Sequence, residues 1–492
     1  MAARLPPVLP PPRKRPPSEA SIQQLSGLDA TFINVETPSA PTHISGLSIY
    51  DQSSALGGFV TFKGILANVE SRLHLADCFR RRLVQVPLGF DHPYWIEDPD
   101  FDLEFHVRHI ALPKPGDWRQ LCIQVARLHA RPLDRGKPLW EMYVIEGLDG
   151  VEGMPPGSFA LFTKIHHAAI DGVSGIEMTA ALHDLTPDGH ATPPEHDWIA
   201  ESPPSVVELA LRSTVNNVRQ PFRFLQILGK AAPPAIRLLL ERRDYDEDDA
   251  PHEVPRTRFN RKVSPHRVFE ARTFRLSDVK QIRKSVEGST VNDVMLAVCS
   301  GALRRYLEQH RELPLDSLSA FAPISTRTPA QQGKAGNQVS GMFVRLHTDE
   351  SDPIERLVKI FKTTLDSKQI TQAVGARSMT DVTQTLPGAL AGISGRLIAR
   401  TGLMSRMRPI ANCVISNVPG PQVPLYFTEA RMVATYGLGL PMEGIGLFHA
   451  IVSYNGAISV CITSCRDQMP DPSFYAECIE ASFRELREAA VA

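Results

Sequence analysis

Hydrophobic positions in the first half of the chain alternate between strand-like and helix-like spacing. Phe159 to Ile165 is a short, mostly apolar run rich in aromatic and branched residues, which predicts a strand buried on both faces. Trp140 to Glu146 also predicts a strand, and its alternation indicates one buried face. Asp117 is expected to cap a helix that continues through His129, with apolar residues at helical spacing on one side. Strands and helices in alternation predict a mixed α/β fold.

The second half continues this mixture of elements. A strand is expected over 269–276, and a helix over 290–308 begins with a capping box between Thr290 and Asp293. Asn455-Gly456 predicts a hairpin with a type I′ turn. Further strands are expected over 320–325, 339–346 and 413–416, a rigid turn with two prolines over 417–421, and a closing helix over 472–489.

The strand over 159–165 delivers ionisable side chains into a loop that precedes a helix. His166 and His167 stand where the strand ends, and Asp171 and Gly172 follow in the loop. A helix is expected over 174–185, opened by a Ser-x-x-Glu capping box. Because active-site groups often lie on loops that a rigid scaffold holds in place, this segment is the candidate site.

The two histidines allow three interpretations. An imidazole suits proton transfer near neutral pH, since its unperturbed pKa is close to 6.5. Successive side chains leaving a strand point to opposite sides, so one of the pair can face a cavity while the other faces the scaffold. A packed or surface pair without a catalytic role is the second interpretation. A metal site is the third, but the chain has neither His-Glu-x-x-His nor a Cys/His cluster, so no metal is expected.

Composition narrows the class of protein. At 492 residues the chain exceeds one ordinary core, so two domains are expected. A net charge of -1 argues against nucleic acid as a partner, because no basic excess exists to neutralise phosphates. Seven scattered cysteines without a Cys-x-x-Cys pair favour a reducing cytoplasm. No stretch reaches the roughly 18 apolar residues that span a bilayer.

The chain divides into four segments by composition. Residues 1–24 form a proline-rich arm expected to be disordered, with weak tethering to anionic lipid as the alternative. Residues 25–190 form an N-terminal subdomain, and 265–492 a C-terminal one. Between them, 191–264 mixes apolar and basic residues, as in an amphipathic helix that lies in a membrane interface or a linker helix packed on the protein. Residues 386–407 are a second candidate for lipid contact.

Four motifs occur in order around the histidines. They are Pro138-Leu139-Trp140, the His-His-x-x-x-Asp-Gly of 166–172, Asn292-Asp293 and the Ser-Asn-Val-Pro-Gly-Pro of 416–421. Together they resemble the bacterial wax ester synthase/diacylglycerol acyltransferase family, within the superfamily that contains chloramphenicol acetyltransferase and the condensation domains of peptide synthetases. The resemblance implies two chloramphenicol-acetyltransferase-like subdomains with an active-site tunnel at their interface, the segment around 416–421 crossing between the halves.

The resemblance also implies roles for the loop residues. His167 would be the general base that takes the proton of an acceptor hydroxyl, and His166 would support the loop. Asp171 would act structurally, because in the superfamily this aspartate commonly pairs with an arginine of the other half. Arg327 is the expected partner and Arg345 the reserve.

The implied substrate-binding residues come from the other motifs. For Asp293 the alternative is a helix cap, and for Trp140 it is a tryptophan packed at a strand start. The set is Asn292, Asp293, Ser416, Asn417, Gly420 and Trp140, together with Gly172 in the histidine loop.

The implied reaction is fatty acyl-CoA-dependent O-acylation of diacylglycerol or a long-chain alcohol. It needs no cofactor, since acyl-CoA is a substrate. The expected location is the cytoplasm, at the surface of the inner membrane or of lipid droplets. Two rival functions stay open: a condensation-type or polyketide-associated acyltransferase with a carrier-bound donor, and a non-catalytic protein that binds lipid surfaces.

Overall fold

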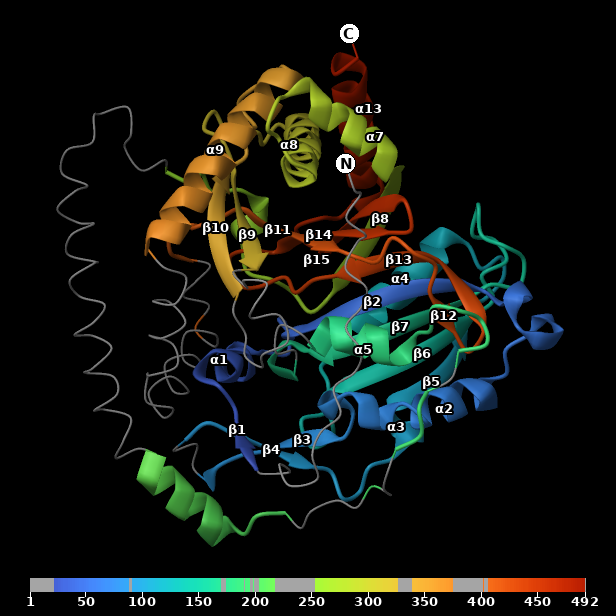
Figure 1. Ribbon diagram of the computed structural model, residues 1–492. Helices are drawn as coiled ribbons and strands as arrows, with labels where there is room; N and C mark the ends of the chain where they lie inside the picture. The colour runs from blue at the N-terminus through green and yellow to red at the C-terminus, as the bar shows by residue number, and fades with distance from the viewer. Residues whose placement is uncertain are drawn as a thin grey trace, which may run out of the picture.

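The computed structural model contains two six-stranded sheets, each with its own helices. It describes residues 22–87, 91–169, 174–189, 191–194, 198, 203–216, 253–325, 339–374, 401 and 406–491. In Figure 1 the sheet of the C-terminal half and its helices lie above the sheet of the N-terminal half. No helix of the described ranges is long and apolar enough to span a membrane.

The N-terminal half is built on a sheet of order β12-β13-β2-β7-β6-β5. Its own strands are β2 (His43–Asp51), β5 (Val107–Ala111), β6 (Trp140–Glu146) and β7 (Phe159–His166). A small sheet of order β1-β4-β3 lies beside it, formed by β1 (Gln23–Gln24), β3 (Arg81–Val84) and β4 (Tyr94–Glu97). The helices are α1 (Gly27–Val35), α2 (Phe62–Glu70), α3 (Leu103–His106), α4 (Trp118–His129) and α5 (Ser174–Leu182).

The alternation along β6 places helices on both faces of this sheet. Met142 and Val144 pack in one cluster with α2 and α5, whereas Tyr143 and Ile145 pack in another with α4. Leu121 of α4 also belongs to a cluster that includes residues of β8, so α4 packs between the two sheets. Every residue of β6 except the last is therefore buried, and the expectation of a single buried face was wrong.

The C-terminal half has a sheet of order β10-β9-β11-β14-β15-β8. Its strands are β8 (Arg267–Arg275), β9 (Ser319–Ser325), β10 (Val339–Arg345), β11 (Cys413–Pro419), β14 (Leu447–Tyr454) and β15 (Ala457–Cys465). The helices α7 (Leu276–Ile282), α8 (Val291–Gln309), α9 (Pro353–Val374) and α13 (Pro472–Ala489) lie above the sheet in Figure 1. Burial of α8 is nearly continuous from Asp293 to Leu303, which makes it the core helix of this half.

Two strands from the C-terminal sequence complete the N-terminal sheet. After β11 the chain forms β12 (Tyr426–Phe427) and β13 (Ala430–Leu438), and β13 pairs antiparallel with β2. The chain then returns to the upper sheet as β14, which pairs with β11 in parallel. The expected crossing of this segment between the halves is confirmed, and it ties the two sheets together by backbone hydrogen bonds.

The other predicted elements are mostly in place. The caps at Asp117 and Thr290 are present, and α13 has the predicted bounds. At the β14–β15 turn, Asn455 and Gly456 have φ of 42° and 84°, as a type I′ turn requires. Order begins slightly earlier than Leu25, because β1 at Gln23–Gln24 pairs with β4. Most of the proline-rich arm lies outside the described residues.

Two boundaries differ from expectation. The helix after the histidine loop ends at Leu182, so Leu185 is 55% exposed, because the backbone of Asp184 instead pairs with Tyr426. The predicted turn after Ser416 is part of β11, which continues to Pro419. A proline fits there because β9 pairs with β11 only at the start of the strand, so the later residues pair with no described strand on that side.

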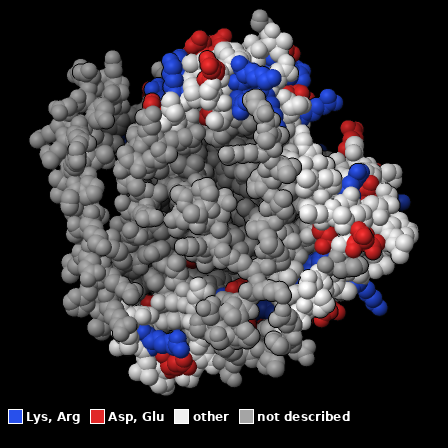
Figure 2. Space-filling model, in the orientation of Figure 1, with Lys and Arg blue, Asp and Glu red and all other residues white. Residues whose placement is uncertain are grey.

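Charge is mixed over the described surface. Figure 2 shows basic and acidic side chains intermixed over the upper helices and the right-hand edge of this face. This distribution agrees with the net charge of -1 and gives no broad patch of one sign among the described residues on view.

Candidate active site

Backbone hydrogen bonds hold the histidine pair at the end of β7. The N–H of His166 donates to the carbonyl of Leu139 at 2.9 Å, and the N–H of His167 donates to that of Thr42 at 2.9 Å. The strand ends at His166, and His167 begins a single 3₁₀ turn that packs against α1. The loop from β7 to the helix is therefore anchored on both sides before residue 170.

His166 is fully buried, and both of its ring nitrogens have partners. Nδ1 accepts from the backbone N–H of Ala168 at 3.0 Å, so the proton of the neutral ring lies on Nε2. Nε2 lies 2.9 Å from Oγ1 of Thr42, and this hydroxyl donates to the carbonyl of Phe32 at 2.9 Å. His166 thus bonds to the scaffold through both ring nitrogens, and its supporting role stays a prediction.

His167 has a different environment. Its ring stacks on Phe32, with centroids 4.0 Å apart and 21° between the planes. Nδ1 is buried and makes no hydrogen bond of normal geometry with a described residue. Burial first, and then the adjacent His166, lower the pKa of His167 to about 4, against a smaller effect of its own backbone. The ring is therefore neutral at pH 7 and able to accept a proton.

A buried carboxylate lies next to the pair. Glu36, at the end of α1, lies 3.6 Å from Nε2 of His166 and accepts from Nε of Arg135 at 2.9 Å. Although burial opposes ionisation, His166 and Arg135 together lower the pKa of Glu36 to about 2. A second guanidinium bond runs from Arg135 to the carbonyl of Ile33 at 2.9 Å, which fixes the end of α1.

Further polar side chains form a buried layer on the α4 side of β7. Lys164 has no exposed surface and donates to the carbonyl of Arg131 at 2.6 Å. Nε2 of His129 donates to the carbonyl of Gly439 at 2.8 Å, so Nδ1 accepts from Ser45. Burial lowers the pKa of His129 to about 3 and lowers that of Lys164. This layer braces the strand that carries the histidines.

The Asn-Asp and Ser-Asn motifs meet at the start of α8. Nδ2 of Asn417 donates to Oδ1 of Asn292 at 3.3 Å. Asp293 is buried and forms the predicted cap, since one carboxylate oxygen accepts from the N–H of Thr290 at 2.8 Å. Its other oxygen accepts from Thr364 at 2.7 Å. Both oxygens of Asp293 therefore serve the fold, whereas Asn292 and Asn417 are partly exposed.

Three other sequence candidates have clear positions. Ser416 lies in β11, partly exposed, next to Asn417. At Gly420 a β-carbon would lie 2.2 Å from the carbonyl oxygen of Ser453, so only glycine fits against β14. Trp140 is 1% exposed, stacks on His106 at 4.5 Å and donates to the carbonyl of Phe79 at 2.9 Å. These contacts match the packing alternative for Trp140.

The proposed clamp falls largely outside the described residues. Asp171, Gly172 and Arg327 are not among them, and the side chains that open α5 are not described either. Arg345 lies 3.7 Å from Asp349 in an ion pair. The described residues contain no group of three or more potential metal ligands.

Sequence reasoning missed the residues that surround the histidines. Phe32, Glu36 and Thr42 come from α1 and the segment before β2, more than a hundred residues before His166. Only the antiparallel register of β2 and β7, in which His43 pairs with His166, brings them to the site. No local motif marks them.

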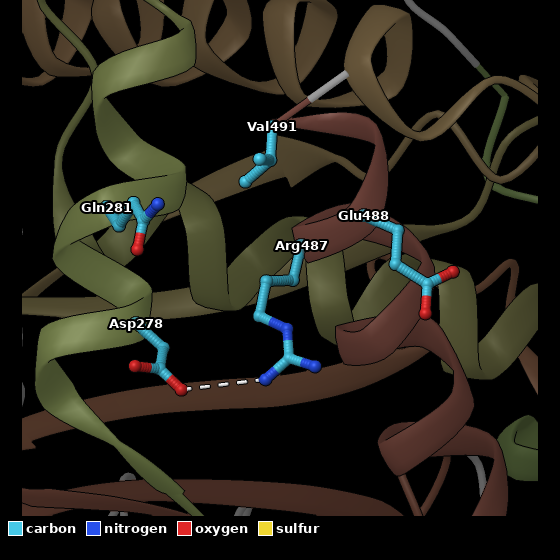
Figure 3. Close-up of a pocket in the computed structure, with 5 residues that line it drawn as sticks. All are labelled: Asp278, Gln281, Arg487, Glu488 and Val491. Atoms are coloured by element: carbon cyan, nitrogen blue, oxygen red, sulfur yellow. Dashed lines mark ion pairs between the residues drawn. The ribbon is translucent and has the colours of Figure 1, made fainter.

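A surface pocket elsewhere carries no comparable chemistry. It lies between α7 and α13, where Arg487 and Asp278 form an ion pair at 3.7 Å (Figure 3). Its other lining residues are Gln281, Glu488 and Val491. Because this lining contains no histidine, the pocket is not the candidate active site.

The chain is similar to known proteins over almost its whole length. It is 33% identical over 472 residues to a protein of Mycobacterium tuberculosis (strain CDC 1551 / Oshkosh) that bears a provisional name as a diacylglycerol O-acyltransferase, covering 96% of this chain and 91% of the relative. A second such protein of the same strain is 34% identical over 455 residues, covering 90% and 92%.

Solved structures share the fold. The wax ester synthase/diacylglycerol acyltransferase of Marinobacter aquaeolei VT8 superposes with a TM-score of 0.66 at 28% identity, covering 96% of this chain and all 100% of that one. The starter condensation domain of rhizomide synthetase, in complex with C8-CoA and Leu-SNAC, gives a TM-score of 0.53 at 12% identity, with coverage of 96% and 95%. At that identity the second likeness shows the fold alone.

Family membership follows from both halves. Residues 25–295 match the wax ester synthase/diacylglycerol acyltransferase catalytic domain, and residues 335–487 match the WS/DGAT C-terminal domain. The resemblance inferred from four short motifs is thereby confirmed, as is the fold it implied. The chain belongs to the wax ester synthase/diacylglycerol acyltransferase family.

Proposed function

We propose that this acyltransferase moves a fatty acyl group from acyl-CoA to a hydroxyl of diacylglycerol or of a long-chain alcohol. The hydroxyl oxygen attacks the thioester carbonyl carbon while His167 accepts its proton. The tetrahedral intermediate then expels the CoA thiolate, which takes the proton back from His167. The products are triacylglycerol or a wax ester and free CoA, and no acyl-enzyme is needed.

The ring of His167, which stacks on Phe32 and whose Nδ1 makes no hydrogen bond of normal geometry with a described residue, is the observation that carries this proposal. A base must be unprotonated at working pH, and burial lowers the pKa of His167 to about 4. Its neighbour His166 cannot take this role, because both of its nitrogens already hydrogen-bond with Ala168 and Thr42. His167 is therefore the member of the pair available to a substrate hydroxyl.

The developing oxyanion needs hydrogen-bond donors. Asn292 accepts from Asn417 through its oxygen, which leaves its amide hydrogens for another acceptor. We assign Asn292, Asn417 and Ser416 to this role, and Asp293 to holding the helix on which Asn292 lies. The helix N-terminus adds a favourable field for negative charge.

The loop clamp remains part of the proposal. Asp171 would pair with Arg327 of the other half and fix the loop after His167, as the family resemblance implies. Because Arg345 is already paired with Asp349, it is the less suitable partner. Asp171→Ala would leave a guanidinium unpaired and lower the yield of folded protein, whereas Asp171→Asn would be milder.

Lipid substrates call for attachment at a lipid surface. Of the two proposed segments, only the helix over 206–216 is described to any extent. Leu209 and Ser213 face the protein, whereas Val207, Leu211 and Val215 are 69%, 64% and 48% exposed and lie four residues apart. Arg212 pairs with Glu208 at 2.8 Å. We propose that the apolar stripe of Val207, Leu211 and Val215 contacts lipid.

Labelled acyl-CoA offered with diacylglycerol and a long-chain alcohol side by side tests the reaction. Wild-type protein should form labelled neutral lipid, and His167→Ala should reduce turnover by about 10²- to 10⁴-fold. His166→Ala should be the milder lesion at equal folded yield. Transfer only from a carrier-bound donor would favour the condensation-type alternative. Lipid binding without transfer from any donor would favour the non-catalytic one.

A further inference from the structure

Thr42 contacts both histidines, although it belongs to no motif of the site. Its side-chain hydroxyl lies 2.9 Å from Nε2 of His166, and its backbone carbonyl accepts from the N–H of His167 at 2.9 Å. Thr42 is only 2% exposed, so neither interaction is in exchange with bulk water. One residue, directly before β2, thus contacts both members of the pair.

The direction of the hydrogen bonds is fixed. Nδ1 of His166 accepts from the N–H of Ala168, so Nε2 carries the hydrogen and must donate. Thr42 accepts this hydrogen, and its own hydroxyl hydrogen goes to the carbonyl of Phe32. The hydrogen bonds thus run in series from the imidazole N–H to the hydroxyl and from the hydroxyl to the carbonyl, and each group in the series has its hydrogen-bond partner.

Phe32, the last residue in this series of hydrogen bonds, supports the ring of His167. The carbonyl of Phe32 lies in the last turn of α1, where intrahelical donors run out, and the hydroxyl of Thr42 supplies one. The ring of the same Phe32 stacks on His167 at 4.0 Å. Holding this turn of α1 therefore holds the phenyl ring that keeps His167 in place and covers one face of its imidazole.

Charged neighbours strengthen the same arrangement. Glu36 bonds to the backbone N–H of Thr42 at 3.3 Å and lies 3.6 Å from His166. Arg135 holds Glu36 and the carbonyl of Ile33 in the same turn of α1. Glu36 and Thr42 therefore both join His166 to the end of α1, and of these two side chains it is that of Thr42 that also bonds to the carbonyl of Phe32.

We propose that Thr42 is a positioning residue for the acyl transfer: its hydroxyl joins His166 to the last turn of α1 and so keeps Phe32 stacked on His167. The inference rests on the proposed function, in which His167 is the base. Since it acts on geometry rather than on substrate affinity, its loss should change kcat and leave KM nearly unchanged.

Three threonine variants test this. Thr42→Val keeps the shape but removes the hydroxyl, and should lower kcat by about 10- to 100-fold with KM within about threefold. Thr42→Ser keeps the hydroxyl and should stay within about threefold of wild type. Thr163→Val is the matched control, since this β7 residue makes only a 3.4 Å bond to the carbonyl of Gly46 and should leave kcat unchanged.

A second readout separates positioning from loss of stability. In Thr42→Val, more water would reach the partly exposed His167, and its pKa should rise from about 4 toward the ordinary value, which moves the acid limb of kcat/KM to higher pH. If Thr42→Val folds poorly, Phe32→Leu, which removes the stacked ring but no hydroxyl, should shift the limb in the same direction.

Ring NMR of histidine-labelled protein, with His167 assigned from a His167→Gln variant, measures the same pKa without any turnover. Failure of the wild type to transfer acyl groups would overturn the proposed function. The pKa of His167, compared between the wild type and Thr42→Val, would still show whether Thr42 positions the ring. An unchanged kcat in folded Thr42→Val, no rescue by Thr42→Ser, or an unchanged pKa of His167 would each overturn the positioning role.

Discussion

The side chain of Asn417 donates to that of Asn292 at 3.3 Å, across 125 residues of sequence. Asn417 lies on β11, and Asn292 lies in the first turn of α8. Two short motifs that are far apart in the chain therefore form one polar pair. The pairing makes the two residues act as a unit in any role that either of them has.

We expect Asn292→Ala and Asn417→Ala each to lower kcat by about 10²-fold, as the loss of an oxyanion donor does. Because the side chains share a hydrogen bond, the double variant should lose little more than the worse single one. Steady-state kinetics of the wild type, the two single variants and the double variant give the double-mutant cycle. Strictly additive losses would show that the two residues act independently.

The activity should depend on pH through His167. A base works only when unprotonated, and the pKa of His167 is lowered to about 4. As pH falls, kcat/KM should therefore drop through pH 4, and it should be flat between about 5 and 7. An acid limb near the ordinary histidine value would mean that His167 is solvated or is not the base.

Acid should weaken the fold through Glu36. Its pKa is about 2 in the folded protein against 4.5 in the reference state, so the unfolded chain binds the proton more readily. Its contribution, on the order of 3 kcal/mol, is complete above pH 4.5 and is lost as the pH falls toward 2. Denaturant unfolding at pH 5.5, 4.5 and 3.5 measures this.

The Glu36→Gln variant is the comparison for that series. It should be less stable than wild type at pH 5.5, and the difference should shrink toward pH 3.5 because only wild type has the titrating carboxylate. Buried histidines away from Glu36, such as His129 and His449, are present in both proteins and cancel in the difference. A difference that does not change with pH would contradict the assignment.

Trp140 should matter for stability rather than for substrate affinity. Trp140→Ala removes a 1% exposed indole from the core and should cost about 3–5 kcal/mol of unfolding free energy. Trp140→Phe should cost less, leaving the carbonyl of Phe79 without its donor. The KM of Trp140→Phe for acyl-CoA should equal that of the wild type. A large increase in KM in a stably folded variant would instead indicate that Trp140 contacts the substrate.

The apolar stripe of the 206–216 helix should control lipid binding. Replacing Val207, Leu211 and Val215 by serine should weaken flotation with vesicles by at least about tenfold, since full burial of each side chain would contribute about 1.5–3 kcal/mol. The control is Leu56→Ser with Leu315→Ser, which changes two leucines that are 90% and 98% exposed elsewhere. Equal flotation of both variants would exclude the stripe.

Local sequence determined most elements of the fold, including the strand β7 that ends at the histidine pair. The apolar run of β7, the caps of α4 and α8 and the Asn-Gly hairpin each depend on neighbours in the chain, so spacing and residue type suffice to predict them. The four motifs likewise identified the family. Boundaries failed where a distant partner intervened, as when Tyr426 ended the helix before Leu185.

Tertiary structure decided what surrounds each of the two histidines. The two are adjacent and chemically identical in sequence, and only the strand register places Thr42 and Glu36 against His166 and Phe32 against His167. Burial then lowers the pKa of His167, an effect that depends on surrounding atoms rather than on chain neighbours. The sequence by itself determined which residue types stand at the end of β7, whereas packing between distant segments decided the separate surroundings of the two rings.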